Sequence, residues 1–260
     1  MRLTITHRRG VASSVGLLLG LLGGCEQPAS PAAVPSPPRT SAPHAVEPAP
    51  SYEALVESID QERARLAGRL ARASAPDERE VVIAEARAAL SRALIDRLLP
   101  RWYGTPWAMN GTTDRPAEGA IACGYFVATI LQDAGFSLHR TRFGQAAALR
   151  IQEATTPPER AVHRFFSIAP EQLADKIAAL GDGVYIIGLN VHVGFVVVRD
   201  GEARLVHASY TDDRVVVDEA LATARAIELS RPKGYFVSEL LSTNAAVERW
   251  LERRPLQLPP

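Results

Sequence analysis

Three residues of this chain have the types and the spacing that nucleophilic catalysis requires. Cys123 opens a mostly apolar segment, CGYFVATILQD, and His192 and His207 follow 15 residues apart. The N-terminus of a helix stabilises a thiolate through its free N–H groups and the positive end of its dipole. A thiol also needs a base, and the base needs a third group that holds its imidazole in one tautomer. We therefore expect Cys123, His192 and His207 to form a catalytic triad.

The elements that must position the two histidines are antiparallel strands. Residues 192–198 and 205–208 are β-branched and aromatic runs, and the Asp200-Gly201 pair between them is typical of a hairpin turn. A turn that lies midway between His192 and His207 brings them close together across the strand pair. We expect further strands over residues 184–187, 214–217 and 234–237.

Helical patterns precede these strands. Helices are expected over residues 122–134, 143–153 and 170–180. The helix over 122–134 begins near Cys123, so its tip carries the thiol. Helices first and antiparallel strands afterwards predict an α+β fold.

A separate helical hairpin is expected over residues 51–99. Apolar residues recur there at helical spacing in two stripes, with charged residues between them. Ser74 and Asp77 resemble a capping box with Pro76 in the first turn of the second helix, and Pro100 is expected to end that helix. We interpret the hairpin as packing against the rest of the chain, and a partner-binding coiled coil is the alternative.

The first 25 residues have the features of an export signal. Basic residues precede a short apolar run that ends in Leu22-Gly23-Gly24-Cys25, and this quartet resembles the bacterial lipobox. The resemblance implies that Cys25 is lipidated, and Glu26 after it is similar to the outer-membrane sorting type. An ordinary secretory peptide is the alternative, and the Arg8-Arg9 pair could also indicate twin-arginine export.

Residues 26–50 are rich in Pro, Ala and Ser and have no apolar periodicity. We expect an extended, disordered tether that holds the domain away from the membrane. The predicted location is the cell envelope, lipid-anchored, at the outer membrane and facing the periplasm. If Cys25 carries lipid, Cys123 has no disulfide partner left in the chain.

Composition gives little indication of other partners. The chain has 260 residues, 29 basic and 29 acidic side chains and no net charge, so neither a nucleic-acid footprint nor a polybasic membrane patch is indicated. A hydrophobic content of 47% is enough for one ordinary core. We expect a monomer that binds no nucleic acid and contacts a membrane only through its anchor.

Several short motifs together resemble the NlpC-type cell-wall peptidases, which are papain-like cysteine peptidases. The matching segments cover residues 103–112 (YGTPWAMNGT), 123–127 (CGYFV), 181–185 (GDGVY), 192–195 (HVGF) and 206–209 (VHAS). The resemblance implies a papain-like hydrolase domain over residues 100–260 with no cofactor. It implies that Cys123 is the nucleophile, His192 the base and His207 the group that orients His192. The substrate that it implies is an amide bond of peptidoglycan stem peptides.

The sequence departs from this family at positions near the thiol. Ala122 stands where the family usually has Asp, and Gly124-Tyr125 replaces Ser-Gly. Trp107 takes the place of a tyrosine, and an indole N–H donates a hydrogen bond but cannot accept one. The loop over residues 111–123 is also longer than usual. These differences leave the triad intact and put the substrate pocket in doubt.

Other roles for the same residues stay open. Trp107, Gln145 and Asn190 are candidates for substrate binding in the cleft. Cys123 could be a buried structural cysteine, since free cysteine is among the most buried residue types. One Cys and two His could also hold zinc, but the chain has no short ligand pair such as C-x-x-C, so we expect no metal.

Three functions follow from these observations. The first is a peptidoglycan endopeptidase. The second is an amidase or acyltransferase of the same fold that acts on another acyl group, which the altered positions Ala122 and Trp107 favour. The third is a catalytically silent cell-envelope lipoprotein that binds wall peptides or a partner. His139 and His163 have no motif around them and are expected to be surface or packing residues.

Overall fold

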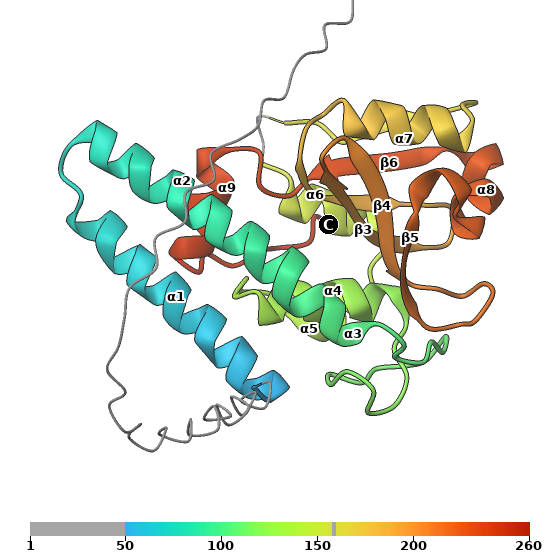
Figure 1. Ribbon diagram of the computed structural model, residues 1–260, viewed down its shortest axis with the longest axis horizontal. Coiled ribbons are helices and arrows are strands. Elements are labelled where there is room, and N and C mark those ends of the chain that lie inside the picture. Colours follow the sequence, from blue (N-terminus) through green and yellow to red (C-terminus); the bar gives the residue numbers. More distant parts are fainter. Residues whose placement is uncertain (1–49, 158–159) are drawn as a thin grey trace, which may run out of the picture. The chain divides into compact units, whose positions relative to one another are not determined.

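The computed structural model describes residues 50–157 and 160–260 (Figure 1). The predicted export signal, the lipidation site at Cys25 and the tether up to residue 49 lie outside the described residues. Within the described part, no helix combines the length and the apolar character that crossing a membrane requires.

Two helices joined by a short turn form the expected hairpin, α1 (Tyr52–Arg72) and α2 (Pro76–Arg92). The apolar stripe of α1 is buried, including Leu55, Ile59 and Leu66. The capping residue of α2 is Ala75, so the prediction of a Ser74–Asp77 box was wrong. The Glu78 carboxylate instead accepts hydrogen bonds from the backbone N–H groups of Ser74 and Ala75, at 3.1 and 3.4 Å.

The second helix continues past the proline that was expected to end it. A π-helical stretch, η1 (Ala93–Leu98), follows α2 and leads into the short α3 (Leu99–Trp102). In this wider turn the N–H of Leu99 donates to the carbonyl of Leu94, five residues back. Pro100 follows directly after this wider π-helical turn, in α3. The chain can therefore remain helical as far as Trp102.

A six-stranded antiparallel sheet forms the centre of the described part, in the order β1-β6-β2-β3-β4-β5. Its strands are β1 (His163–Phe165), β2 (Gly183–Gly188), β3 (Val193–Arg199), β4 (Glu202–Ala208), β5 (Val216–Ala220) and β6 (Tyr235–Glu239). Five of them were predicted, and β1 is too short for its pattern to show. Asp200 and Gly201 form the β3–β4 turn with positive φ angles, as the Asp-Gly pair predicted.

Helices cover both faces of this sheet (Figure 1). Alternate residues of β2, β3 and β4 belong to two separate hydrophobic clusters, one with α1, α2 and α4 (Cys123–Asp133), the other with α7 (Pro170–Ala178) and α8 (Arg225–Ser230). The remaining helical elements are α5 (Arg140–Gly144), α6 (Ala148–Thr155), α9 (Asn244–Leu251) and the 3₁₀ turns Leu221–Thr223 and Arg231–Lys233. The described part is thus an α+β fold, as predicted.

The helix expected over residues 143–153 is divided into α5 and α6. The break comes at Gly144, which closes α5, and Ala147 before α6 has an extended backbone. A Cβ atom on Gly144 would lie 2.7 Å from the ring of Tyr125, and one on Gly124 would lie 2.3 Å from the carbonyl oxygen of Gly144. The chain therefore bends where α5 packs against the first turn of α4. A glycine is required on each side of that contact.

Candidate active site

Two buried histidines and a glutamate form a hydrogen-bonded row on neighbouring strands. Nε2 of His192 lies 2.7 Å from Nδ1 of His207, and Nε2 of His207 lies 2.8 Å from Oε1 of Glu219. His192 is 4% exposed and His207 is 0% exposed. The sequence predicted that the two histidines would meet, and the structure brings them together. Glu219 was missed.

Strand register explains how Glu219 reaches the pair. His207 pairs with Val217 across β4 and β5, so Glu219, two residues further on, projects from the same face and is the diagonal neighbour of His207. The predicted strand ended at Val217, one alternation too early. Continuing its period-2 pattern by two residues would have placed Glu219 beside His207.

Gly194 makes room for His207 on the adjacent strand. A Cβ atom on Gly194 would lie 2.8 Å from Cβ of His207 and 3.2 Å from the carbonyl oxygen of Val206. Any larger residue at this position would push β3 and β4 apart or displace the imidazole. The glycine of the HVGF segment therefore has a packing role in the site.

The hydrogen bonds among these three side chains determine which nitrogen of each imidazole carries the hydrogen. An ionised carboxylate only accepts hydrogen bonds, so Nε2 of His207 carries the hydrogen that points to Glu219. With both rings neutral, Nδ1 of His207 then accepts from Nε2–H of His192. Nδ1 of His192 is left without a proton. That nitrogen has the lone pair that a general base needs.

Burial keeps His192 neutral. Burial lowers its pKa well below 6.5, and the neighbouring His207 lowers this pKa further because two positive rings repel each other. The base form of His192 therefore persists at acidic pH. A base of this kind is strongest when a negative charge at Glu219 stabilises the positive charge that develops on the pair.

Cys123 is the first residue of α4, directly after the extended Ala122, and its thiol is free and half-buried. Burial raises the pKa of this thiol above 9.0, and the backbone N–H groups of Val193, Gly124 and Cys123 act in the opposite direction. The helix tip stabilises the thiolate as expected, but desolvation has the larger effect on this pKa.

The thiol and the histidine row approach each other at one end of the sheet. No hydrogen bond joins Cys123 to His192 among the described residues, and the thiol lies against the N–H of Val193, the residue after His192. α4 packs on the sheet face that holds Phe195, whereas His207 lies two residues after Leu205 on β4 and so shares the face that packs against α7. The thiol at the tip of α4 and the histidine row therefore come together at the start of β3.

Tyr210 and Trp107 line the space beside these groups. The Tyr210 ring lies 5.0 Å from that of His192 and 6.4 Å from that of Trp107, centroid to centroid. Burial raises the pKa of the Tyr210 hydroxyl, and the nearby Cys123 raises it further. The guanidinium of Arg214 stacks 4.6 Å from the Trp107 ring, whose Nε1 is buried without a hydrogen-bond partner in the described part.

Tyr210 follows the VHAS segment but carries no motif of its own. Its position beside His192 depends on how the β4–β5 loop folds. The sequence therefore offered no signal for it.

The other two predicted substrate contacts lie apart from the histidine row. Gln145 is exposed at the end of α5, and its amide donates to the hydroxyl of Tyr125 at 3.3 Å. Asn190 is exposed between β2 and β3, and its backbone N–H donates to Oγ of Ser230 at 2.9 Å. Gln145 is close to the first turn of α4 through Tyr125. The structure does not bring Asn190 to the thiol.

The long loop before Cys123 folds back on itself. The N–H of Ala122 donates to the carbonyl of Gly111 at 2.9 Å, and the N–H of Ile121 donates to the carbonyl of Pro106 at 2.8 Å. A Cβ atom on Gly111 would lie 2.6 Å from the backbone of Ala120 and Ile121. These contacts hold the part of the loop that contains Trp107 against the residues that lead into Cys123.

Comparisons with protein-family models, with curated proteins and with solved structures find no match for this chain. Among the residues that the structure describes, no group of three or more His, Cys, Asp or Glu side chains is placed to hold a metal ion.

Proposed function

We propose that this protein is a cysteine hydrolase that cleaves an amide bond in peptidoglycan stem peptides. The observation that carries the proposal is the row formed by the buried His192 and His207 and the partly exposed Glu219, together with a free thiol at a helix tip that lies against the backbone N–H of Val193. Desolvation offsets much of what such buried polar contacts contribute, so they are weak evidence for a stabilising role. The papain-like class, the peptidoglycan substrate and the lipid anchor rest on the motif resemblance.

Catalysis begins from a neutral thiol and a neutral imidazole. Nδ1 of His192 takes the thiol proton as the sulfur attacks the amide carbonyl, which gives a tetrahedral oxyanion. The free N–H of Cys123 at the helix tip stabilises this oxyanion. The C–N bond then breaks as His192 returns the proton to the leaving amine. Water, activated by the same imidazole, hydrolyses the thioester to release the acid and restore the thiol.

The departures near the thiol leave a second reaction open. Trp107 has an unpaired buried N–H and supports an amidase or acyltransferase acting on a different acyl group. Both reactions use the same thioester and differ in the acyl group and in the acceptor.

The test is product analysis. The purified protein is incubated with peptidoglycan fragments beside a Cys123→Ala variant, and products are identified by mass spectrometry. A new amine and acid pair formed only by the unaltered protein supports the proposal and names the bond. Absence of any cleavage, with a folded protein whose thiol reacts with iodoacetamide, would contradict the peptidoglycan substrate. If the thiol also failed to react, the function that remains would be a catalytically silent lipoprotein that binds wall peptides or a partner.

A further inference from the structure

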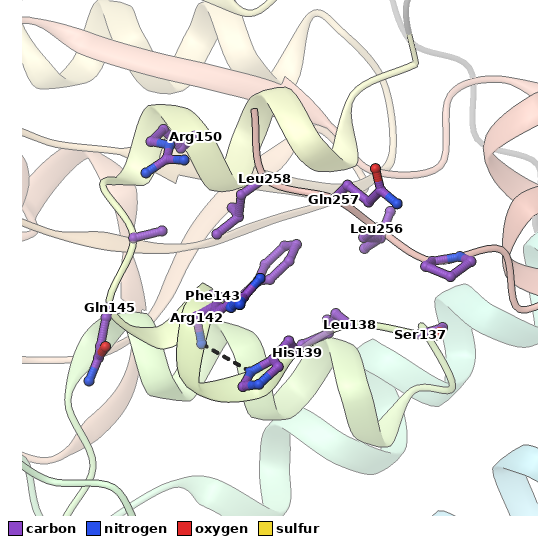
Figure 2. A pocket seen from close by; sticks show the side chains of 12 residues that line it. Ser137, Leu138, His139, Arg142, Phe143, Gln145, Arg150, Leu256, Gln257 and Leu258 are labelled. Carbon is purple, nitrogen blue, oxygen red and sulfur yellow. Dashed lines mark hydrogen bonds between the residues drawn. The ribbon is translucent and has the colours of Figure 1, made fainter. Parts of the chain in front are cut away.

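A groove lined by basic side chains lies along α5 (Figure 2). The carbonyl of Gly144, beside Gln145 of this lining, packs against Gly124, the residue after Cys123. The groove has a volume of about 740 Å³ and lies between α5, α6 and the C-terminal segment 255–258. The segment is fixed there by a hydrogen bond from the N–H of Leu256 to the carbonyl of Ser137, at 2.8 Å. Gln145 marks the end of the groove that is nearest to Cys123, through its contact with Tyr125.

The lining of this groove is unbalanced in charge. It contains Arg142, Arg150 and His139 and no carboxylate. Four other hollows of the described part each combine arginine or another polar residue with Asp or Glu in their lining. The chain as a whole has equal numbers of acidic and basic side chains. A cationic wall without a carboxylate in its lining is therefore, within the described residues, a local feature of this groove.

The cationic groups are free to bind a ligand. Arg142 makes no ion pair and no side-chain hydrogen bond with the described residues, and Arg150 donates only to the carbonyl of Pro259. Phe143, Leu256 and Leu258 supply apolar surface between them. Planar guanidinium groups match carboxylates in geometry, and the apolar surface suits the methyl and methylene groups of a short peptide.

We infer that this groove binds the carboxylate-bearing part of an acidic peptide while the scissile amide lies at Cys123. The inference rests on the proposed function for the nature of the ligand. Gln145 connects the two places, because it lines the groove and contacts the residue two positions after the nucleophile. Arg142 and Arg150 would then determine which peptides are accepted, and they would not take part in the bond cleavage.

Binding can be measured without turnover. The probe is the tripeptide L-alanyl-γ-D-glutamyl-diaminopimelate, titrated by calorimetry into the Cys123→Ala protein, with the fully amidated tripeptide as the comparison. Loss of one charged hydrogen bond weakens binding about tenfold. Arg142→Gln and Arg150→Gln are each expected to raise the Kd of the free acid about tenfold. The amidated peptide loses both contacts, so it should bind about 100-fold more weakly to the protein with both arginines and be insensitive to either substitution.

The control is Arg72→Gln, an exposed arginine at the end of α1 that has no ion pair among the described residues. It should leave both affinities unchanged, and thermal unfolding should show that Arg150→Gln has not released the C-terminal segment. Unchanged affinity in both groove variants would overturn the inference. Displacement of the peptide by an equal concentration of inorganic phosphate would also overturn it, because the groove would then be an unselective anion site.

The inference and the proposed function fail separately. Arginine-dependent binding without any cleavage would contradict hydrolysis and keep the groove as a carboxylate site. If the Arg142→Gln protein cleaves the peptide with an unchanged KM, the hydrolase proposal stands and the groove does not bind the substrate.

Discussion

Two histidine–glutamate pairs lie near opposite edges of the same sheet. They differ in the distance between the side chains, in exposure and in their further hydrogen-bond partners. His207 and Glu219 are 2.8 Å apart, and the histidine side chain is 0% exposed. His163 and Glu239 are 3.3 Å apart, and that histidine side chain is 36% exposed. Glu239 also accepts a hydrogen bond from Arg160 at 2.8 Å, whereas His207 uses its second nitrogen to hold His192.

Exposure and the further hydrogen-bond partners distinguish a pair that can act in catalysis from a pair on the surface. At the β1–β6 edge the glutamate is shared by the exposed Arg160 and the partly exposed His163, and such surface contacts contribute little to stability. In the β4–β5 pair Glu219 fixes the tautomer of His207, and His207 in turn fixes the tautomer of His192. A surface pair can therefore serve as a control for the buried row.

The largest effect is expected at the thiol and at the histidine proposed as its base. Cys123→Ala and His192→Ala should each lower kcat/KM at least about 1,000-fold, because nucleophile and base act as one unit. His163→Ala should stay within about twofold of the unaltered protein. Initial rates on the same peptide, with circular dichroism to check folding, measure this. Residual activity of a tenth or more in His192→Ala would mean that another group is the base.

Glu219→Gln should have the next largest effect. The amide can still accept the hydrogen of His207 Nε2 but lacks the charge that stabilises a cationic histidine pair. Because loss of this charge makes the histidine pair harder to protonate, we expect kcat/KM to fall about tenfold and the acid limb of its pH profile to move to lower pH. Glu239→Gln is the matched control and should change neither quantity.

Equal effects of the two glutamine variants would remove the distinction between the pairs. A purely structural Glu219 would lower the melting temperature and leave the pH profile in place.

The pH dependence of thiol alkylation tests the charge state of the site. Because burial raises the pKa of Cys123, its reaction with iodoacetamide should be slow at pH 7 and should still increase with pH above 9.0. Because burial lowers the pKa of His192, hydrolysis should persist well below pH 6.5. The rate of alkylation from pH 5 to 10, followed by intact mass, measures the first. Full alkylation within minutes at pH 5 would instead indicate a thiolate–imidazolium pair.

The smallest effect on activity is expected at a carboxylate far from both pairs. Asp133 accepts a hydrogen bond from the Tyr52 hydroxyl at 2.6 Å, and burial raises its pKa from 3.8 to about 6. The folded state therefore binds this proton more tightly than the unfolded chain does. Stability that is present in acid should be lost as the pH rises from about 4 to about 6, by about 2 kcal/mol.

Asp133→Asn should flatten that dependence and leave kcat/KM unchanged. Urea unfolding at pH 4.5 and pH 7 measures it. A free energy of unfolding that depends on pH to the same extent in this variant would assign the effect to another group.

The sequence predicted the parts of the site that depend on local pattern. Alternation over residues 192–208 and the Asp200-Gly201 turn placed His192 beside His207, and the apolar run after Cys123 predicted its helix. What it could not predict depends on register between strands or on loop packing. Glu219 needs the β4–β5 register, and Tyr210 needs the fold of the loop that follows β4.

Two errors in the helices involve a glycine and a proline. The helix expected over residues 143–153 ran through Gly144, whose low helix propensity agrees with the break that the structure shows there. The Tyr125 ring leaves no room for a side chain at this position, so a glycine is required. Pro100 was expected to end a helix and does not, because a π-turn precedes it. The pKa of Cys123 depends on burial in the folded chain, which its position at a helix tip does not reveal.

The central claim is that Cys123 forms a thioester with the substrate. The most direct measurement is an acid quench of the protein during turnover of a peptidoglycan fragment, followed by intact-mass and peptide mass spectrometry. We predict an added acyl mass on the peptide that contains Cys123, which disappears with time and is absent from Cys123→Ala. Turnover with no adduct on Cys123, or turnover that survives in Cys123→Ala, would contradict the account.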